Sequence, residues 1–411
     1  MPMAHCCSAI RSENHLPNAQ RCDLSLYLAY CMTFPTLPMA LLLRFVRARF
    51  WLAMLVLAVA CSPKGTMDEE EDPIVAPTPY TLTLPATFPQ SPTIPTDNPL
   101  TNEGVALGRM LFYETRLSRN NTLSCGSCHQ QSKAFTDGRA RALGVDGRQH
   151  PRGAMSLTNL LWETTLNWDG AATTLETQAR IPIENEVELH QSLAAGVAKL
   201  QQTDLYPPLF LKAFGSKTIT EENTLKALAQ FERTLISANS RYDRYYAGNR
   251  SVLTPDEVQG LMLFNNHPEP SHGIAGANCF HCHGGTLFTA RDFFNNGLDL
   301  SFADNGRGQA TGQAFDNGKF RAPTLRNIAL TAPYMHDGRF ATLEEVVDHY
   351  SDHVQQQSTN IDPNMLDATN VPFGNQLSLS ATQKRQLVAF LKTLTDTTFV
   401  QDKRFANPFT P

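Results

Sequence analysis

Two motifs of the same form, Cys-x-x-Cys-His, constrain this chain more than any other feature of its sequence. The first is CGSCH at residues 125–129 and the second is CFHCH at residues 279–283. Two thiols and an imidazole within one short turn can attach haem through two thioethers, with the histidine as proximal iron ligand. The sequence therefore predicts two covalently bound c-type haems. The residues that would hold them are Cys125, Cys128, His129, Cys279, Cys282 and His283.

A zinc site or a pair of redox-active thiols is the alternative interpretation, because two CxxC pairs with histidines offer enough metal ligands. Zinc ribbons and fingers usually keep their cysteine pairs within about 15 to 20 residues. Here a stretch long enough to form a domain separates the two pairs. Haem is therefore the favoured prediction.

An export signal is predicted near the N-terminus. Arginines at positions 44, 47 and 49 precede an apolar run over residues 50–60, which ends directly at Cys61. This order is typical of a signal peptide, whereas a retained membrane helix, the alternative, needs about 20 apolar residues. We expect export to the periplasm, since c-type haems are attached outside the cytoplasm. The segment before Cys61 also resembles a bacterial lipoprotein cleavage site, which leaves a lipid anchor at Cys61 open.

Residues 1–38 lie upstream of this signal, and Met39 is an alternative start of the chain. Without them the cysteines are Cys61 and the two motif pairs, so a disulfide scaffold is not predicted. The formal net charge of −5, with no block of Lys or Arg, argues against a nucleic-acid partner.

Hydrophobic periodicity predicts a mainly α protein. Apolar residues recur at helical spacing in several segments after residue 100, and strand-like alternation is scarce. A Leu-Phe pair precedes each motif, at 111–112 and at 263–264, and this weak repeat predicts two cytochrome c-like domains in tandem. The expected divisions are an upstream region and export signal (1–60), a Pro-rich tether (61–100), an N-terminal haem domain (101–249) and a C-terminal haem domain (250–411).

The second axial face of each haem iron decides between electron transfer and reaction with a small oxidant. Spacing alone does not choose the residue that fills it. The candidates are the His, Met and Tyr residues outside the motifs, namely His150, Met155, His190, His267, His272, Met335, His336, His349, Tyr350, His353 and Met365.

A family resemblance adds to this interpretation. Residues 319–350, KFRAPTLRNIALTAPYMHDGRFATLEEVVDHY, closely resemble the signature of bacterial dihaem cytochrome c peroxidases and of the related MauG-type enzymes. Residues 107–129 and the triplet at 168–170, followed by Gln178 and Glu188, resemble the same family. The resemblance extends from about Pro95 to Phe399, and on it the chain is identified as a member of this superfamily.

The resemblance implies a role for each matching residue. His129 would be the proximal ligand of a peroxide-reacting haem, and His283 that of an electron-relay haem. Trp168 matches the tryptophan between the haems, with an ordinary core aromatic as the alternative. Gln178 and Glu188 match the distal pair over the first haem, where a carboxylate can take a proton from one peroxide oxygen and return it to the other. Without the resemblance, Glu188 would be taken for a solvated residue.

Three positions depart from the peroxidase pattern. Val145 stands where many peroxidases place a histidine that caps the first haem, so that haem should be open to peroxide unless His150 substitutes. Tyr350 occupies the position at which the peroxidases have the methionine ligand of the relay haem, and the MauG/MbnH-like branch has tyrosine there. Met335 or Met365 is the alternative iron ligand. Backbone oxygens of Thr331 and Pro333 match a calcium site, but Gly153 replaces its asparagine.

The resemblance thus implies an exported dihaem enzyme that uses hydrogen peroxide to oxidise a partner protein, at a tryptophan side chain, by long-range electron transfer. A cytochrome c peroxidase that takes electrons from a small redox protein is the first alternative. A dihaem electron-transfer cytochrome without enzymatic activity is the second.

Overall fold

The computed structural model describes residues 75–410, and the structural statements that follow concern this part of the chain. The predicted export signal, Met39 and the lipidation candidate Cys61 lie outside it. Between residues 75 and 410, no helix combines the length and the apolar character that crossing a membrane requires.

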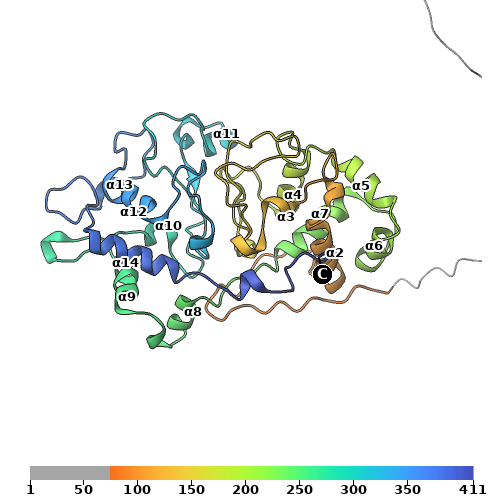
Figure 1. Ribbon diagram of the computed structural model, residues 1–411, viewed down its shortest axis with the longest axis horizontal. Helices are drawn as coiled ribbons and strands as arrows, with labels where there is room; N and C mark the ends of the chain where they lie inside the picture. The colour runs from red at the N-terminus through yellow and green to blue at the C-terminus, as the bar shows by residue number, and fades with distance from the viewer. Residues whose placement is uncertain (1–74, 411) are drawn as a thin grey trace, which may run out of the picture. The chain divides into compact units, whose positions relative to one another are not determined.

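Helices make up nearly all of the regular secondary structure in the described residues, which confirms the predicted mainly α class (Figure 1). Strands are limited to one short antiparallel pair, β1 (Phe293–Phe294) with β2 (Phe320–Arg321). Long loops and short 3₁₀ turns join the helices. These are α2 (Asn102–Phe112), α3 (Cys125–Cys128), α4 (Leu175–Glu184), α5 (Leu193–Gln201), α6 (Tyr206–Phe214), α7 (Glu221–Glu232), α8 (Arg241–Tyr246), α9 (Pro255–Asn265), α10 (Phe280–His283), α11 (Arg307–Thr311), α12 (Leu343–Asp352), α13 (Asn364–Asp367) and α14 (Ala381–Lys392).

Side chains in the sequence set where the long helices begin. Helix α9 starts at Thr254, whose hydroxyl accepts from the backbone N–H of Glu257 while the Glu257 carboxylate accepts from the N–H of Thr254. This reciprocal capping box satisfies two donors that a helix start leaves free, and Pro255 fits the first turn because it has no N–H. Helices α12 and α14 begin with the same device at Thr342 and Ser380.

Two helix crossings have the same construction, α2 against α7 and α9 against α14. Each is built around a glycine in a matching sequence, GRMLF at 108–112 and GLMLF at 260–264. A Cβ atom at Gly108 would overlap the carbonyl oxygen of Ala227, and one at Gly260 would overlap that of Gln386. The Leu-Phe pairs that follow are buried. The repeat in the sequence is therefore a repeat of close helix packing.

The hydrophobic core falls into two large clusters, one around each crossing. The first holds residues from α2 and α4 to α7, and the second holds residues from α9, α12 and α14. The C-terminal end joins the first cluster, where Phe399 packs on Phe135 and Phe405 on Phe231 (Figure 1). The predicted domain boundary near Asn249 stays a prediction, because the last residues of the chain return to the N-terminal core.

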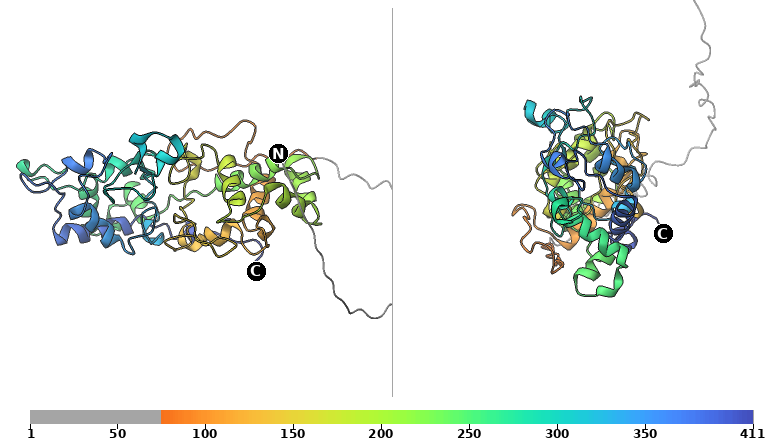
Figure 2. Two further views of the ribbon diagram at one scale, coloured as in Figure 1. Left: turned by 90° about the horizontal axis from the view of Figure 1, so that it is seen from above. Right: turned by 90° about the vertical axis from the view of Figure 1, so that its left-hand side faces the viewer.

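Residues 75–100, the described part of the predicted Pro-rich tether, form a long segment without helices or strands (Figure 2). Side-chain contacts fix this part to the rest of the protein. Phe88 is buried and meets Trp162 edge-on at 5.2 Å between ring centroids, with the Arg326 guanidinium 4.5 Å from its ring. The indole N–H of Trp162 donates to the carbonyl oxygen of Pro89 at 2.8 Å. Composition predicts the extended backbone, but these distant partners hold it in place.

Replacing Gly260 with alanine tests the close crossing of α9 and α14. We expect Gly260→Ala to lower the free energy of unfolding. The added methyl group forces the helices apart, which costs about 1–3 kcal/mol. Alanine offsets about 0.5–1 kcal/mol of that cost, because it suits a helix interior better than glycine. Urea unfolding of the haem-loaded protein, followed by far-ultraviolet circular dichroism, measures it. Met262→Ala is the control, since Met262 is exposed on the same helix. Equal stability of Gly260→Ala and wild type would contradict this packing argument.

Candidate functional site

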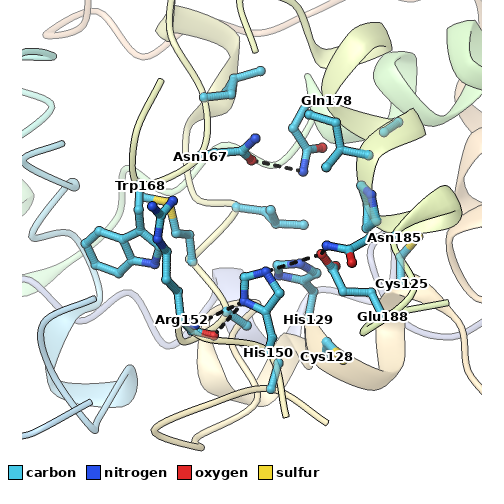
Figure 3. A pocket seen from close by; sticks show the side chains of 18 of the residues that line it. Cys125, Cys128, His129, His150, Arg152, Asn167, Trp168, Gln178, Asn185 and Glu188 are labelled. Atoms are coloured by element: carbon cyan, nitrogen blue, oxygen red, sulfur yellow. Dashed lines mark hydrogen bonds and ion pairs between the residues drawn. The ribbon is translucent and has the colours of Figure 1, made fainter. Parts of the chain in front are cut away.

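The first motif forms one wall of a cavity of about 370 Å³ (Figure 3). Helix α3 begins at Ser124, whose N–H donates to the Ser127 hydroxyl at 3.0 Å. This short turn brings Cys125, Cys128 and His129 to the cavity. The volume lies in the range of ligand pockets, and most of the remaining wall is apolar.

The second motif forms the wall of another cavity, of about 200 Å³. Cys279, Cys282 and His283 line it beside one face of α12, which contributes residues at the spacing of successive helical turns. Those residues are Leu343, Val346, Val347 and Tyr350.

Both motif histidines have a fixed orientation. Nδ1 of His129 lies 2.8 Å from the carbonyl oxygen of Phe135, and Nδ1 of His283 lies 3.1 Å from that of Pro323. A carbonyl oxygen only accepts, so Nδ1 carries the proton and Nε2 is left with its lone pair. Burial lowers the pKa of His129, and it lowers the pKa of His283 to about 4. Both are therefore neutral imidazoles at pH 7, the form that binds a metal.

The four motif cysteines are free thiols in the cavity walls. Burial raises the pKa of Cys128 to about 11 and those of Cys279 and Cys282 to about 12, and it also raises that of Cys125. They therefore stay protonated at pH 7. Paired thiols beside a neutral imidazole in an apolar cavity fit a covalently attached haem. They fit zinc poorly, because structural zinc takes four ligands and in residues 75–410 no group of three or more His, Cys, Asp or Glu side chains is placed to hold a metal ion.

Tyr350 lies in the wall of the second cavity. Its hydroxyl accepts from Nδ2 of Asn296 at 2.9 Å, and the same Nδ2 lies 3.6 Å from Sδ of Met335. Burial raises the pKa of the Tyr350 phenol. Met335 and Met365 line this cavity too, so the structure brings all three ligand candidates together and does not choose among them.

Trp168 lines both cavities. Its indole N–H donates to the carbonyl oxygen of Gly153 at 2.9 Å, and its own carbonyl accepts from the N–H of Arg321 at 2.9 Å. Arg321 lines both cavities as well, and its buried Nε has no hydrogen-bond partner in the protein. An unpaired N–H donor on a residue that lines both cavities fits the carboxylate groups that haem carries.

Gln178 and Glu188 lie in the wall of the first cavity, as predicted for a distal pair (Figure 3). Nε2 of Gln178, from α4, is 3.5 Å from Oδ1 of Asn167. Nδ2 of Asn185 donates to Glu188 at 2.8 Å. Burial raises the pKa of Glu188, against the lowering effects of His150 and Asn185. A carboxyl group with a raised pKa in a cavity is suited to exchanging protons.

Val145 does not line the first cavity, but its N–H donates to the carbonyl oxygen of Glu188 at 2.7 Å. It belongs to a hairpin over residues 142–150, in which Leu143 pairs with Gln149. His150, at the end of this hairpin, lines the cavity and places Nε2 at 3.6 Å from Oε1 of Glu188.

Two further groups in these walls were missed by sequence reasoning. Arg152 is buried and forms ion pairs with Asp169 at 2.6 Å and Asp304 at 2.7 Å. Glu232 is buried against the first cavity with an unpartnered Oε2, and burial raises its pKa to about 8, so it is neutral at pH 7. No local sequence pattern identifies either residue, because distant segments supply their partners and bury them.

The predicted calcium ligands do not complete a calcium site. Thr331 and Pro333 offer backbone oxygens, but Gly153 offers no side-chain oxygen, and its N–H donates to the carbonyl of His336. In residues 75–410 no group of three or more His, Cys, Asp or Glu side chains is placed to hold a metal ion. Calcium takes six to eight oxygen ligands, so the residues present do not account for it.

Two cavities, each with a CxxCH wall and joined by one tryptophan, define a dihaem c-type protein. Comparisons with known proteins agree: the family described as di-haem cytochrome c peroxidase matches residues 102–251. Methylamine utilization protein MauG of Methylorubrum extorquens is 38% identical, over 74% of this chain and 82% of that protein. Cytochrome c551 peroxidase of Nitrosomonas europaea is 36% identical, over 59% of this chain and 71% of that protein.

Among solved structures, a MauG-like protein associated with microbial copper homeostasis superposes with a TM-score of 0.72 at 36% identity, covering 80% of this chain and 100% of that one. The chain belongs to the dihaem cytochrome c peroxidase/MauG family, which confirms the predicted membership. It is therefore a haem-dependent oxidoreductase that uses peroxide.

Covalent haem attachment predicts a defined mass. The protein should carry the mass of two haems, and the double variant Cys125→Ala/Cys128→Ala should carry one, because a haem without thioethers is released when the protein unfolds. Intact-mass spectrometry under denaturing conditions measures it. Cys279→Ala/Cys282→Ala is the reciprocal control and should keep the other haem. Two haems on either double variant would contradict the assignment.

Proposed function

We propose that this protein is a MauG/MbnH-like enzyme that uses hydrogen peroxide to oxidise a tryptophan side chain of an exported partner protein. The observation that carries the proposal is the carboxylate of Glu188 in the wall of the first cavity, combined with Tyr350 in the second. The first arrangement suits peroxide cleavage, and the second suits the tyrosine-ligated branch.

Each cavity would hold one haem in a cytochrome c-like domain, residues 101–249 for the first and 250–411 for the second. His129 and His283 would supply the proximal nitrogens, with Tyr350 as the second ligand in the C-terminal cavity. When bound, the haems supply the redox chemistry, the reduction of peroxide and the storage of its two oxidising equivalents. Calcium is not part of the proposal, because the donors at Thr331, Pro333 and Gly153 fall short.

Glu188 would act as the acid/base on peroxide. As a carboxylate it accepts the proton of one peroxide oxygen, and it then returns that proton to the other oxygen, which leaves as water. Burial favours the protonated form of Glu188, which makes this carboxylate a better proton acceptor. The Gln178 amide, in the same wall, can donate to a peroxide oxygen and orient it.

Trp168 would connect the two cavities. An indole is a large conjugated group, and its contacts with both cavities and its hydrogen bond to Gly153 hold it in one orientation. Electrons from the partner could then reach the first cavity through the second without the partner entering either. This arrangement suits a macromolecular substrate that docks at the surface.

The relatives support two branches of this proposal. Similarity to MauG and to a MauG-like protein associated with copper homeostasis favours side-chain oxidation. Similarity to cytochrome c551 peroxidase favours the alternative, in which a small redox protein donates the electrons. Val145 and Tyr350 favour the first branch. Val145 replaces the capping histidine of many peroxidases, and Tyr350 replaces their methionine ligand. Export to the periplasm and a lipid anchor at Cys61 remain proposals that rest on the sequence.

Glu188→Gln tests the acid/base role. We expect the variant to keep both haems and to react with stoichiometric peroxide about 10²–10⁴ times more slowly, the usual contribution of a general acid/base. Stopped-flow absorbance measures this rate. Glu186→Gln is the matched control, because Glu186 is exposed and pairs only with Arg148. Unchanged peroxide reactivity in Glu188→Gln would contradict the acid/base role, whereas a wild type that does not react with peroxide would favour the dihaem electron carrier.

The product formed on the partner protein separates the two enzymatic branches. Wild type with peroxide and an exported protein encoded beside it should add oxygen to a tryptophan of that protein, detected by peptide mass spectrometry, and Glu188→Gln should not. Rapid turnover of a reduced small cytochrome, without any change in partner mass, would support the cytochrome c peroxidase alternative.

Tyr350→Phe tests the ligand of the second haem. Low-temperature electron paramagnetic resonance of the oxidised protein should show one high-spin and one low-spin ferric signal, with the low-spin signal changed by the variant. Tyr334→Phe is the control, because Tyr334 lines the same cavity but bonds to the carbonyl of Ile328. If Met335→Leu changes the low-spin signal and Tyr350→Phe does not, methionine is the ligand.

A further inference from the structure

His150 has a polar neighbour at each of its ring nitrogens (Figure 3). Nε2 lies 3.6 Å from Oε1 of Glu188. Nδ1 lies 3.0 Å from the carbonyl oxygen of Arg152 and 3.1 Å from the N–H of the same residue. The ring therefore stands between the backbone of Arg152 and the carboxylate of Glu188. The axial-ligand role that the sequence left open for His150 stays a prediction.

The backbone of Arg152 can satisfy Nδ1 in every protonation state of the ring. When Nδ1 carries a proton it donates to the carbonyl oxygen, and when it does not it accepts from the N–H. With Nδ1–H bound to the carbonyl, Nε2 is free to gain or lose a proton toward Glu188. This is the arrangement in which one nitrogen orients a histidine and the other exchanges protons.

We propose that His150 is the proton partner of Glu188, a positioning residue that holds the carboxylate at the cavity and stores the proton it accepts. The proposal rests on the proposed peroxide chemistry of Glu188. The separation of 3.6 Å is slightly long for a hydrogen bond, and catalytic hydrogen bonds are often long before substrate binds. A small rotation of either side chain closes it.

The proposed proton transfers balance. Glu188 accepts one proton from peroxide and passes it to Nε2 of His150, which leaves a carboxylate beside an imidazolium. The same proton returns through Glu188 to the departing oxygen as the O–O bond breaks, and water leaves. The pair neither consumes nor releases a proton, and the two electrons that reduce the peroxide come from the established haem-dependent activity.

The other charged groups near this pair are engaged with one another. Asp146 at the tip of the hairpin pairs with Arg119 and, at 2.8 Å, with His190. Glu186 pairs with Arg148 at 3.7 Å and is exposed. On the cavity side, the motif thiols of Cys125 and Cys128 lie close enough to feel the charge of Glu188, and neither is a cation. Among the described residues, His150 is thus an ion-pair partner of Glu188 whose ring can take up a proton.

The test compares two variants of the haem-loaded protein. His150→Gln keeps a polar side chain that can hydrogen-bond but cannot carry a proton, and His150→Leu keeps neither property. His190→Asn is the control, because His190 pairs with Asp146 and has a positive φ that asparagine tolerates. Retention of both covalent haems and of the resting ferric spectrum verifies that each variant is folded.

Two quantities are measured against pH, namely the rate constant for the reaction with peroxide and the infrared carbonyl band of protonated Glu188. The band is identified by its loss in Glu188→Gln, and it reports the proton without turnover. Because His150 stabilises the carboxylate, both His150 variants should shift the midpoint of the band upward by about one pH unit or more. Both should react about tenfold or more slowly at pH 7, while His190→Asn should match wild type.

A His150→Gln protein that matches wild type in both quantities would overturn the proposal, because hydrogen bonding alone would then suffice. Failure of the proposed function looks different. In that case Glu188→Gln itself reacts with peroxide at the wild-type rate. If Glu188→Gln reacts slowly but the His150 variants react at the wild-type rate, only the role of His150 is contradicted.

Discussion

The hydrogen bonds from His129 and His283 to backbone carbonyls are the constraint on which the rest of the structure depends. Each fixes one tautomer and aims Nε2 away from the backbone, and each acceptor lies outside the motif, at Phe135 and Pro323. Burial keeps both imidazoles neutral. A local motif therefore becomes an iron-binding wall only when a distant or following loop supplies the acceptor, and the two cavities are built around that requirement.

The residues between the two cavities are held in fixed positions, and some of them are charged. Trp168 is held at its indole nitrogen and at its carbonyl, while Arg321 and Arg152 bring guanidinium groups to the same place. The buried pair of Arg321 with Glu163 at 2.6 Å leaves Nε of the arginine without an acceptor. An unpaired buried donor is costly in a protein without ligand, and a haem carboxylate would offset that cost. Cofactor binding and the link between the cavities thus depend on the same residues.

Much of the fold follows from local rules. Thr254, Thr342 and Ser380 cap helices by hydrogen bonds to residues three positions on, so sequence alone identifies these starts. The Leu-Phe pairs at 111–112 and 263–264 predict a repeat, but the close helix crossings that this repeat forms and the packing of Phe88 on Trp162 have no local signal. For the same reason composition described residues 75–100 as a tether, while the tertiary structure binds them to the protein.

The sequence by itself determined the two haem-binding motifs, the helical class and the family, because each depends on residues close together in the chain or on a long matching pattern. Tertiary structure decided the rest of the site. His150 comes within 3.6 Å of Glu188 only because the hairpin over 142–150 folds onto the loop after α4. Proton exchange works over a few ångströms, and contacts between separate segments at that distance are set by packing.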